Sequence, residues 1–158
     1  MRLALTTVLI VAVIVAVAGG GSMFTTGSMD WYATLDLPAF TPPGRIIGMV
    51  WGVIYALSAL AAFLICGDHR DPRRLRWLSV LLLVNAALNL LWTWLFFAQH
   101  AIGLALAEMV LLNLSTLAII VLSWRSLRVA ALLLVPYFAW VSFATFLTAE
   151  ILRLNREG

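Results

Sequence analysis

Uncharged, strongly apolar stretches recur along the whole chain, with short polar segments between them. The stretches are Leu3–Met29, Ile46–Cys66, Trp77–Gln99, Met109–Trp124 and Val129–Ala149. A transmembrane helix needs roughly 20 predominantly apolar residues. The fourth stretch reaches that length only if the helix begins near Ala101 and takes Glu108 into the membrane. The pattern predicts an all-α integral membrane protein, a single five-transmembrane-helix bundle with helices at about 3–21, 45–66, 75–98, 101–123 and 127–153.

Charged residues are scarce and are placed at the expected helix ends. They make up 11% of the 158 residues, against roughly 25% in a soluble domain. So few charged side chains cannot cover the surface of a soluble domain. All ten basic residues are arginine, and their position at helix ends indicates a lipid bilayer and no nucleic acid as partner. Seven lie on one side of a five-span arrangement and three on the other: Arg2, Arg70, Arg73, Arg74, Arg76, Arg125 and Arg128, against Arg45, Arg153 and Arg156. The positive-inside rule then predicts a cytoplasmic N-terminus and a C-terminus on the opposite side.

The first apolar stretch has a second interpretation. Met1-Arg2, the apolar run and Ala16-Val17-Ala18 before Gly19 also resemble a secretory signal peptide with its cleavage site. Cleavage there would leave four spans. We favour five, because the uncharged segment continues to a spanning length.

Polar and aromatic residues inside three of the expected helices recur at helical spacing, so each set shares one face. The sets are Gly48, Trp51, Tyr55 and Ser58; Asn85, Asn89, Trp92 and Phe96; and Tyr137, Trp140, Ala144 and Thr148. Three such stripes predict an interior pocket with flat aromatic walls and a few hydrogen-bonding groups, suited to a large planar apolar ligand. Ordinary membrane packing, in which Asn and Ser bond between helices, is the alternative for the polar members.

The one long connection, residues 22–44, is rich in aromatic residues and prolines where a passive linker is Gly/Ser-rich. It contains Trp31, Tyr32 and Pro42. We expect it to fold back as a lid over the pocket. The alternative is that Trp31 and Tyr32 anchor the chain at the level of the lipid headgroups.

Conventional catalysis is not predicted. Two histidines and seven acidic residues so placed form no metal-ligand set, no Ser/His/Asp arrangement and no carboxylate pair, and we expect His69 and His100 to be exposed. Glu108 is costly to ionise in lipid and must pair, protonate or face water. A structural and a functional role for it stay open.

An ordered series of motifs along the chain is similar to one known family. The series is Trp31-Tyr32, Pro42-Pro43-Gly44, Trp51 with Tyr55, Asn89 with Trp92, Phe96 and Phe97, Val135-Pro136-Tyr137 with Trp140, and Ala144-Thr145. In this order and across five spans it resembles the TspO/MBR family, the tryptophan-rich sensory proteins related to the mitochondrial translocator protein.

The resemblance implies a five-helix bundle, commonly a homodimer, in a bacterial cell membrane. It implies binding of porphyrins such as protoporphyrin IX or haem as ligands, with no covalently bound cofactor, in a pocket that opens toward the long loop. Trp51, Asn89, Trp140 and Ala144 match residues that line it. Light-dependent porphyrin breakdown is reported for some bacterial members, and Trp51 and Trp140 match the tryptophans implicated there.

Two departures from the family pattern stand out. Phe40 follows Ala39 where many relatives have a tryptophan before the proline pair, which changes the lid. The segment 147–153 lacks the tyrosine of the animal cholesterol motif, so we do not expect regulated cholesterol binding. Three functions remain in competition: a porphyrin receptor or carrier, a light-dependent porphyrin-degrading enzyme, and an interaction partner whose tryptophans only pack.

Overall fold

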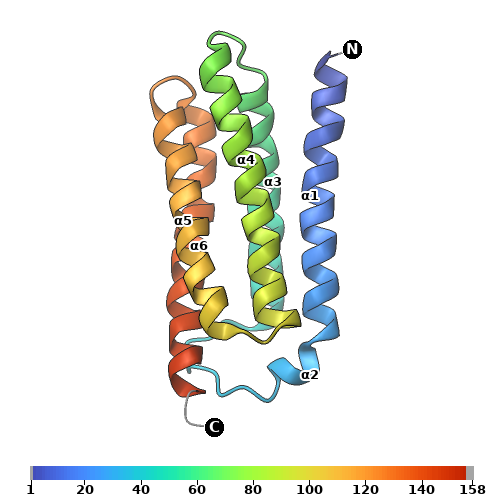
Figure 1. Cartoon of the computed structure of the whole chain (residues 1–158), viewed down its shortest axis with the longest axis vertical. Helices are drawn as coiled ribbons and strands as arrows, with labels where there is room; N and C mark the ends of the chain where they lie inside the picture. The colour runs from blue at the N-terminus through green and yellow to red at the C-terminus, as the bar shows by residue number, and fades with distance from the viewer. Residues whose placement is uncertain (1, 156–158) are drawn as a thin grey trace.

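A computed structural model describes residues 2–155, and within them every regular element is a helix (Figure 1). Five of the helices are long and apolar enough to cross a membrane. The expectation of an all-α, five-helix membrane bundle is therefore confirmed. In chain order the elements are α1 (Arg2–Gly27), α2 (Met29–Tyr32), α3 (Gly44–Cys66), α4 (Pro72–Thr93), the π-helical turn η1 (Trp94–Ala98), α5 (Ile102–Trp124) and α6 (Arg128–Leu154).

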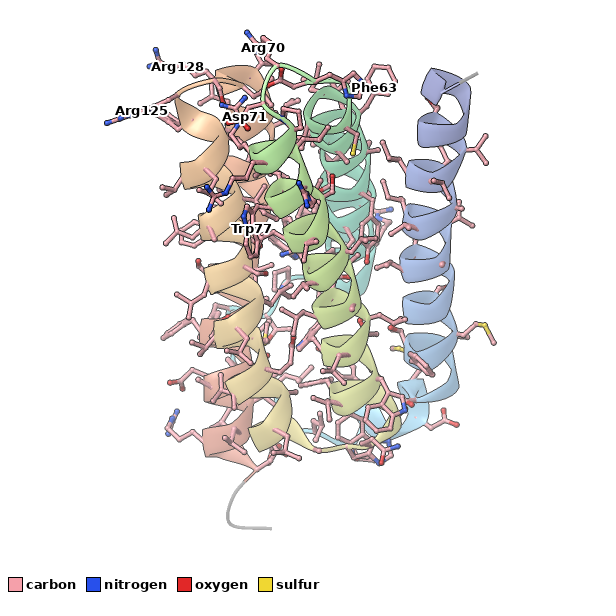
Figure 2. All side chains as sticks on the ribbon, turned by 45° about the horizontal axis from the view of Figure 1, so that its top comes forward. Phe63, Arg70, Asp71, Trp77, Arg125 and Arg128 are labelled. Atoms are coloured by element: carbon pink, nitrogen blue, oxygen red, sulfur yellow. The ribbon has the colours of Figure 1, made fainter. Side chains whose placement is uncertain are left out.

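The five long helices run alternately up and down, with α1 at one edge of the bundle (Figure 1). The N-terminus and the α3–α4 and α5–α6 connections lie at one end, which we call the arginine-rich end. Arg70, Arg125 and Arg128 project from it in Figure 2. The other end, the loop end, holds α2, the α2–α3 connection and the η1–α5 turn. Arg156 lies outside the described residues, as does the side chain of Arg2.

The core lies between α3, α4, α5 and α6. Ala61, Ala130 and Ala131 are fully buried in it, and such small residues let the helix backbones approach closely. Asn85 of α4 donates from Nδ2 to Ser115 Oγ (2.8 Å) and Thr116 Oγ1 (2.9 Å) of α5. Hydrogen bonds of this kind stabilise helix pairs in lipid, where burial of apolar surface between helices supplies little driving force.

One boundary differs clearly from the sequence-based expectation. Helix α1 continues to Gly27, where residues 22–27 were expected in the long loop. These residues contain no proline and no charge, so nothing ends the helix there, and Thr25 Oγ1 bonds back to the Gly21 carbonyl (2.9 Å). The connection that remains consists of the short α2 and residues 33–43.

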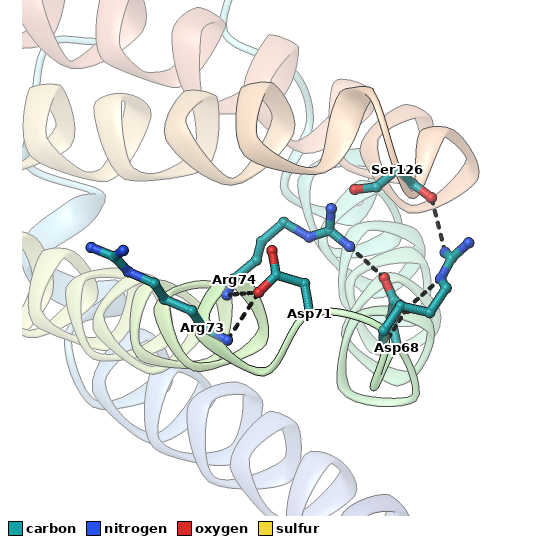
Figure 3. Close-up of polar contacts among 6 residues, drawn as sticks. Asp68, Asp71, Arg73, Arg74 and Ser126 are labelled. Carbon is teal, nitrogen blue, oxygen red and sulfur yellow. Dashed lines mark hydrogen bonds and ion pairs between the residues drawn. The ribbon is translucent and has the colours of Figure 1, made fainter.

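At the arginine-rich end, the α3–α4 turn is fastened to the α5–α6 turn (Figure 3). Asp68 accepts hydrogen bonds from Arg70 Nε and from Arg74, each 2.7 Å long, while Arg70 also donates to the Ser126 carbonyl (3.2 Å). The bond from Arg70 is the main reason that the pKa of Asp68 is lowered to about 2. Asp71 caps α4 by accepting from the backbone N–H groups of Arg73 and Arg74, as an N-cap aspartate does.

Candidate functional site

The centre of the site is a hydrogen-bonded chain of three side chains from three helices. Tyr55 of α3 donates from its hydroxyl to Asn89 Oδ1 (3.1 Å), and Asn89 of α4 donates from Nδ2 to the Tyr137 hydroxyl of α6 (3.0 Å). Asn89 and Tyr137 are buried. Buried polar groups in lipid must find hydrogen-bond partners within the protein, so these two hydrogen bonds fix the relative positions of the three helices.

Aromatic rings cover this chain on the side toward the loop end. Trp51 stacks against Tyr55 (ring centroids 5.5 Å apart) and Trp92 (5.8 Å), and meets Tyr137 edge-on at 6.3 Å. These separations are within the range of favourable aromatic pairs. One or two residues from each of the three predicted stripes therefore meet, and we call Trp51, Tyr55, Asn89, Trp92 and Tyr137 the central cluster.

The π-helical turn extends the central cluster toward the loop end. Phe96 and Phe97 of this turn contact each other (4.9 Å) and Trp92 (6.3 and 6.4 Å). Single π-helical turns are frequent at functional sites. The sequence carried no visible signal for it, because η1 reads as a continuation of the apolar helix before it.

The connection between α1 and α3 packs onto these rings. Trp31 meets Phe96 edge-on at 5.6 Å and stacks on His100 at 4.0 Å, and Tyr32 lies 5.9 Å from Phe97. His100 is exposed on its outer side, as expected, and adopts a positive φ of 54° in the η1–α5 turn. Trp31 and Tyr32 thus contact the interior aromatic residues and do more than anchor the chain at the headgroups.

Residues 33–43 are held at two further points. Phe40 stacks on Phe146 of α6 (5.4 Å). Asp36 and Asn155 exchange two hydrogen bonds, from Asp36 N to Asn155 Oδ1 (3.1 Å) and from Asn155 Nδ2 to the Asp36 carbonyl (3.0 Å). Sequence reasoning missed Asn155, because a partner 119 residues away leaves no local pattern.

The remaining predicted residues lie around the central cluster at varying distance. Trp140 packs against Phe143 (5.4 Å), and Ala144 is buried one turn further along α6. Asn85 belongs to the separate contact between α4 and α5 described above, which favours the packing interpretation for that residue. Pro42 is half-buried and Gly48 is exposed, with open space where a Cβ would lie.

Several buried polar atoms near the cluster have no hydrogen-bond partner among the described residues. They include the indole Nε1 of Trp92, the indole Nε1 of Trp140 and both carboxyl oxygens of Glu108, a residue only 5% exposed. Unsatisfied buried groups are rare in native proteins and call for an explanation. The two indole N–H groups, of which that of Trp92 belongs to a ring stacked on Trp51, are available to a ligand that brings its own acceptors.

A cavity of about 420 Å³ lies on the other side of the Tyr55–Asn89–Tyr137 chain. It runs between α1, α3 and α4 toward the arginine-rich end, and it is lined by residues such as Val13, Ser58 and Leu82. Of the predicted site residues, Tyr55, Asn85, Asn89 and Tyr137 line it, whereas the tryptophans do not. Within residues 2–155, no group of three His, Cys, Asp or Glu side chains is placed to hold a metal ion.

These features define a class of protein: a five-helix membrane protein with an aromatic interior site beneath a loop that is hydrogen-bonded to the end of α6. Residues 8–154 match the TspO/MBR family, and the chain belongs to that family. It is similar to the tryptophan-rich protein TspO of Bacillus cereus, with 36% identity over 79% of this chain and 80% of the relative. It is also similar to the protein of the same name from Chlorobaculum tepidum (33%, 96% of each chain) and to the human translocator protein (32%, 85% of this chain and 81% of the relative). The match begins inside α1, so that helix is part of the shared family fold.

Proposed function

We propose that this protein is a membrane-embedded binding protein, a sensor or carrier, for porphyrins and related planar apolar ligands. The observation that carries the proposal is the central cluster, in which the indole of Trp92 stacks on Trp51 and has a buried N–H without an acceptor; the buried N–H of Trp140 on α6 also lacks one. A porphyrin offers a large apolar face for stacking and carboxylate side chains as hydrogen-bond acceptors, and it thus complements both features.

Access to the central cluster requires a rearrangement, because the rings of Trp51 and Trp92 stack on each other. We assign the opening to α2 and residues 33–43, which cover the rings. Trp31 and Tyr32 pack on the rings of η1, and residues 33–43 are held by Phe40 on Phe143 and Phe146 and by the Asp36–Asn155 pair. Loops of this kind are drawn from the less stable parts of a fold. This segment acts as the lid.

Quenching of tryptophan fluorescence on titration with protoporphyrin IX tests the proposal in the full-length protein in lipid nanodiscs. We expect saturable quenching and an affinity at least tenfold lower for Trp51→Phe combined with Trp140→Phe. The matched control is Trp77→Phe combined with Trp124→Phe, since both of these tryptophans are exposed on the outer surface. Equal affinities for the two double variants would leave the tryptophans with a packing role only.

The light-dependent breakdown of bound porphyrin is a second candidate function. It is favoured by the contact of Trp51 with Tyr55, Trp92 and Tyr137 at 5.5–6.3 Å, because tryptophan and tyrosine are the side chains most easily oxidised by one electron. Trp51 and Trp140 are the residues we assign to it. Illumination of the complex in air then gives a defined product that is lost in Trp51→Phe, whereas bleaching at the rate of free porphyrin contradicts it.

We further propose a cytoplasmic N-terminus, an opposite C-terminus and a homodimer in a bacterial cell membrane. The orientation is supported by the six arginines whose side chains are described at the arginine-rich end, against Arg45 and Arg153 at the loop end. Labelling of single cysteines introduced at Ser126 and Ala39 in intact cells, in a Cys66→Ser background, tests it. Labelling of the residue-39 cysteine alone by a membrane-impermeant reagent is expected.

A further inference from the structure

The cavity between α1, α3 and α4 is a long, narrow slot. Along α4 its lining residues run from Leu75 to Asn89, which is about 21 Å at 1.5 Å per residue. Its volume of about 420 Å³ leaves room for a single hydrocarbon chain along that length.

The slot exists because α1 approaches α4 at one level and diverges from it at another. At Gly20, a Cβ would lie 3.0 Å from Leu90 Cδ1, and at Gly21 it would lie 3.7 Å from Thr93. Glycine at position 20 allows α1 to pack closely on Leu90 near the loop end, whereas the distance at Gly21 is an ordinary van der Waals contact. Toward the arginine-rich end the side chains of Leu9, Val13 and Val17 line one wall of the slot, and the opposite wall belongs to α3 and α4.

A histidine lines the mouth of the slot, and an exposed arginine, Arg76, lies on α4 next to the lining residue Leu75. His69 and Leu75 line the mouth at the arginine-rich end. Arg76 lies three residues before Ser79, which also lines the slot, so the two share a helix face. In the described part of the chain, Arg76 forms no ion pair, whereas Arg70 and Arg74 are taken up by Asp68. An anionic group at the mouth would therefore find an uncommitted arginine.

One polar atom inside the slot lacks a partner. Ser58 Oγ is buried and forms no hydrogen bond within residues 2–155, although a serine in a membrane helix can bond to the carbonyl four residues earlier. It lies eight residues from Cys66, which lines the slot near its mouth, or about 12 Å along α3. A ligand oxygen at that depth would satisfy it.

We propose that this slot binds a long-chain carboxylate of the fatty-acid class, with the carboxylate beside His69 and Arg76 and the hydrocarbon chain along α1. Ser58 selects chains that carry a hydroxyl or keto oxygen near their middle. The slot extends about 21 Å, against about 15 Å for one leaflet of the hydrocarbon core, so it accepts a whole chain. This site is separate from the porphyrin proposal, and the two share only the wall formed by Tyr55, Asn89 and Tyr137.

Native mass spectrometry of the full-length protein, with titration of stearate and of stearate bearing a mid-chain hydroxyl, tests the proposal. We expect saturable one-to-one binding of both acids, tighter for the hydroxylated one. Ala86→Phe fills the slot and is expected to weaken both at least tenfold, while Ala87→Phe, on the exposed neighbouring position of α4, leaves both unchanged. Equal binding by these two variants would overturn the location.

Two further variants test the chemistry without filling the slot. Arg76→Gln is expected to weaken the acid at least threefold and to leave the methyl ester unaffected, and Ser58→Ala is expected to abolish the preference for the hydroxylated chain. Binding of the methyl ester or of a phospholipid as tightly as the free acid would overturn the carboxylate assignment and point to a membrane lipid chain. An unchanged preference in Ser58→Ala would overturn the role of that hydroxyl.

Discussion

Replacement of Asn89 by leucine gives the sharpest test of the central cluster. The change keeps the approximate size of the side chain but removes both bonds of the Tyr55–Asn89–Tyr137 chain. Interhelical hydrogen bonds in membrane proteins average about 0.6 kcal/mol, so the two together contribute about 1 kcal/mol. The Tyr137 hydroxyl, on a residue that is 5% exposed, is then left buried and unpaired, which costs about 1–3 kcal/mol more. We expect a loss of about 2–4 kcal/mol.

The free energy of unfolding is measured by titration with sodium dodecyl sulfate in mixed micelles, followed by far-ultraviolet circular dichroism. The matched control is Asn113→Leu. Asn113 meets Thr145 and Ser142 at 3.3 Å in each case, and both hydroxyls also bond to backbone carbonyls of α6 at 2.7–2.8 Å. No partner is orphaned there, so we expect a loss below about 1 kcal/mol.

A double-variant cycle with Tyr137→Phe separates the bond from the cost of the orphaned hydroxyl. If Tyr137 is stranded by Asn89→Leu, the addition of Tyr137→Phe should restore about 1 kcal/mol or more. Two results would refute the view that the Tyr55–Asn89–Tyr137 hydrogen bonds hold α3, α4 and α6 together. One is a free energy of unfolding for Asn89→Leu within about 0.5 kcal/mol of the original, and the other is the absence of coupling between positions 89 and 137.

Four further perturbations address other parts of the molecule. The pKa of Asp68 is lowered from its unfolded value of about 3.9 to about 2. Its stabilising effect is therefore complete above about pH 4 and is lost as the pH falls toward 2. Denaturant titrations over this range should show a smaller loss of unfolding free energy for Asp68→Asn than for the original protein. Gly20→Ile should destabilise the protein by about 1 kcal/mol relative to Gly19→Ile, because a Cβ at position 20 meets Leu90 at 3.0 Å and one at position 19 meets nothing within 4 Å; equal stabilities would contradict the close approach of α1 to α4. Phe40→Ala should speed hydrogen exchange in residues 33–43 and leave α5 unchanged, since it removes the stacking on Phe146; unchanged exchange would mean that the other contacts suffice to hold the lid. Glu108→Leu should raise the stability by about 1–3 kcal/mol by removing a buried carboxyl with no described partner; a less stable variant would show that the carboxyl is satisfied in the membrane.

The sequence predicted the transmembrane helices well and the connections between them less well. The spans of α3, α5 and α6 agree with expectation to within about one residue, because an apolar run bounded by charges defines both ends of a helix in lipid. The end of α1 was placed six residues too early, since the uncharged residues 22–27 are compatible with either helix or loop. The π-helical turn was not predicted, because residues 94–98 continue the apolar pattern of the helix before them.

The candidate site, too, was predicted in part from the sequence and decided in part by the packing of the helices. Helical spacing alone grouped Trp51 with Tyr55, Asn89 with Trp92, and Tyr137 with Trp140, and it required each group to face the interior, because lipid tolerates polar groups poorly. The depth and facing of the three stripes relative to one another depend on how the helices pack. The structure joined Tyr55, Asn89 and Tyr137 in one hydrogen-bonded chain and sent Asn85 to a different contact, with Ser115 and Thr116.

By itself, then, the chain's sequence determined the membrane class, the five spans and the inward faces, since these follow from local hydropathy and helical period. The tertiary structure alone decided what the faces meet. The stacking of Trp51 on Trp92, the bond between Asp36 in the α2–α3 connection and Asn155, and the slot beside α1 all join residues distant in sequence. Their positions depend on side-chain packing between helices, and no periodicity within one helix encodes that packing.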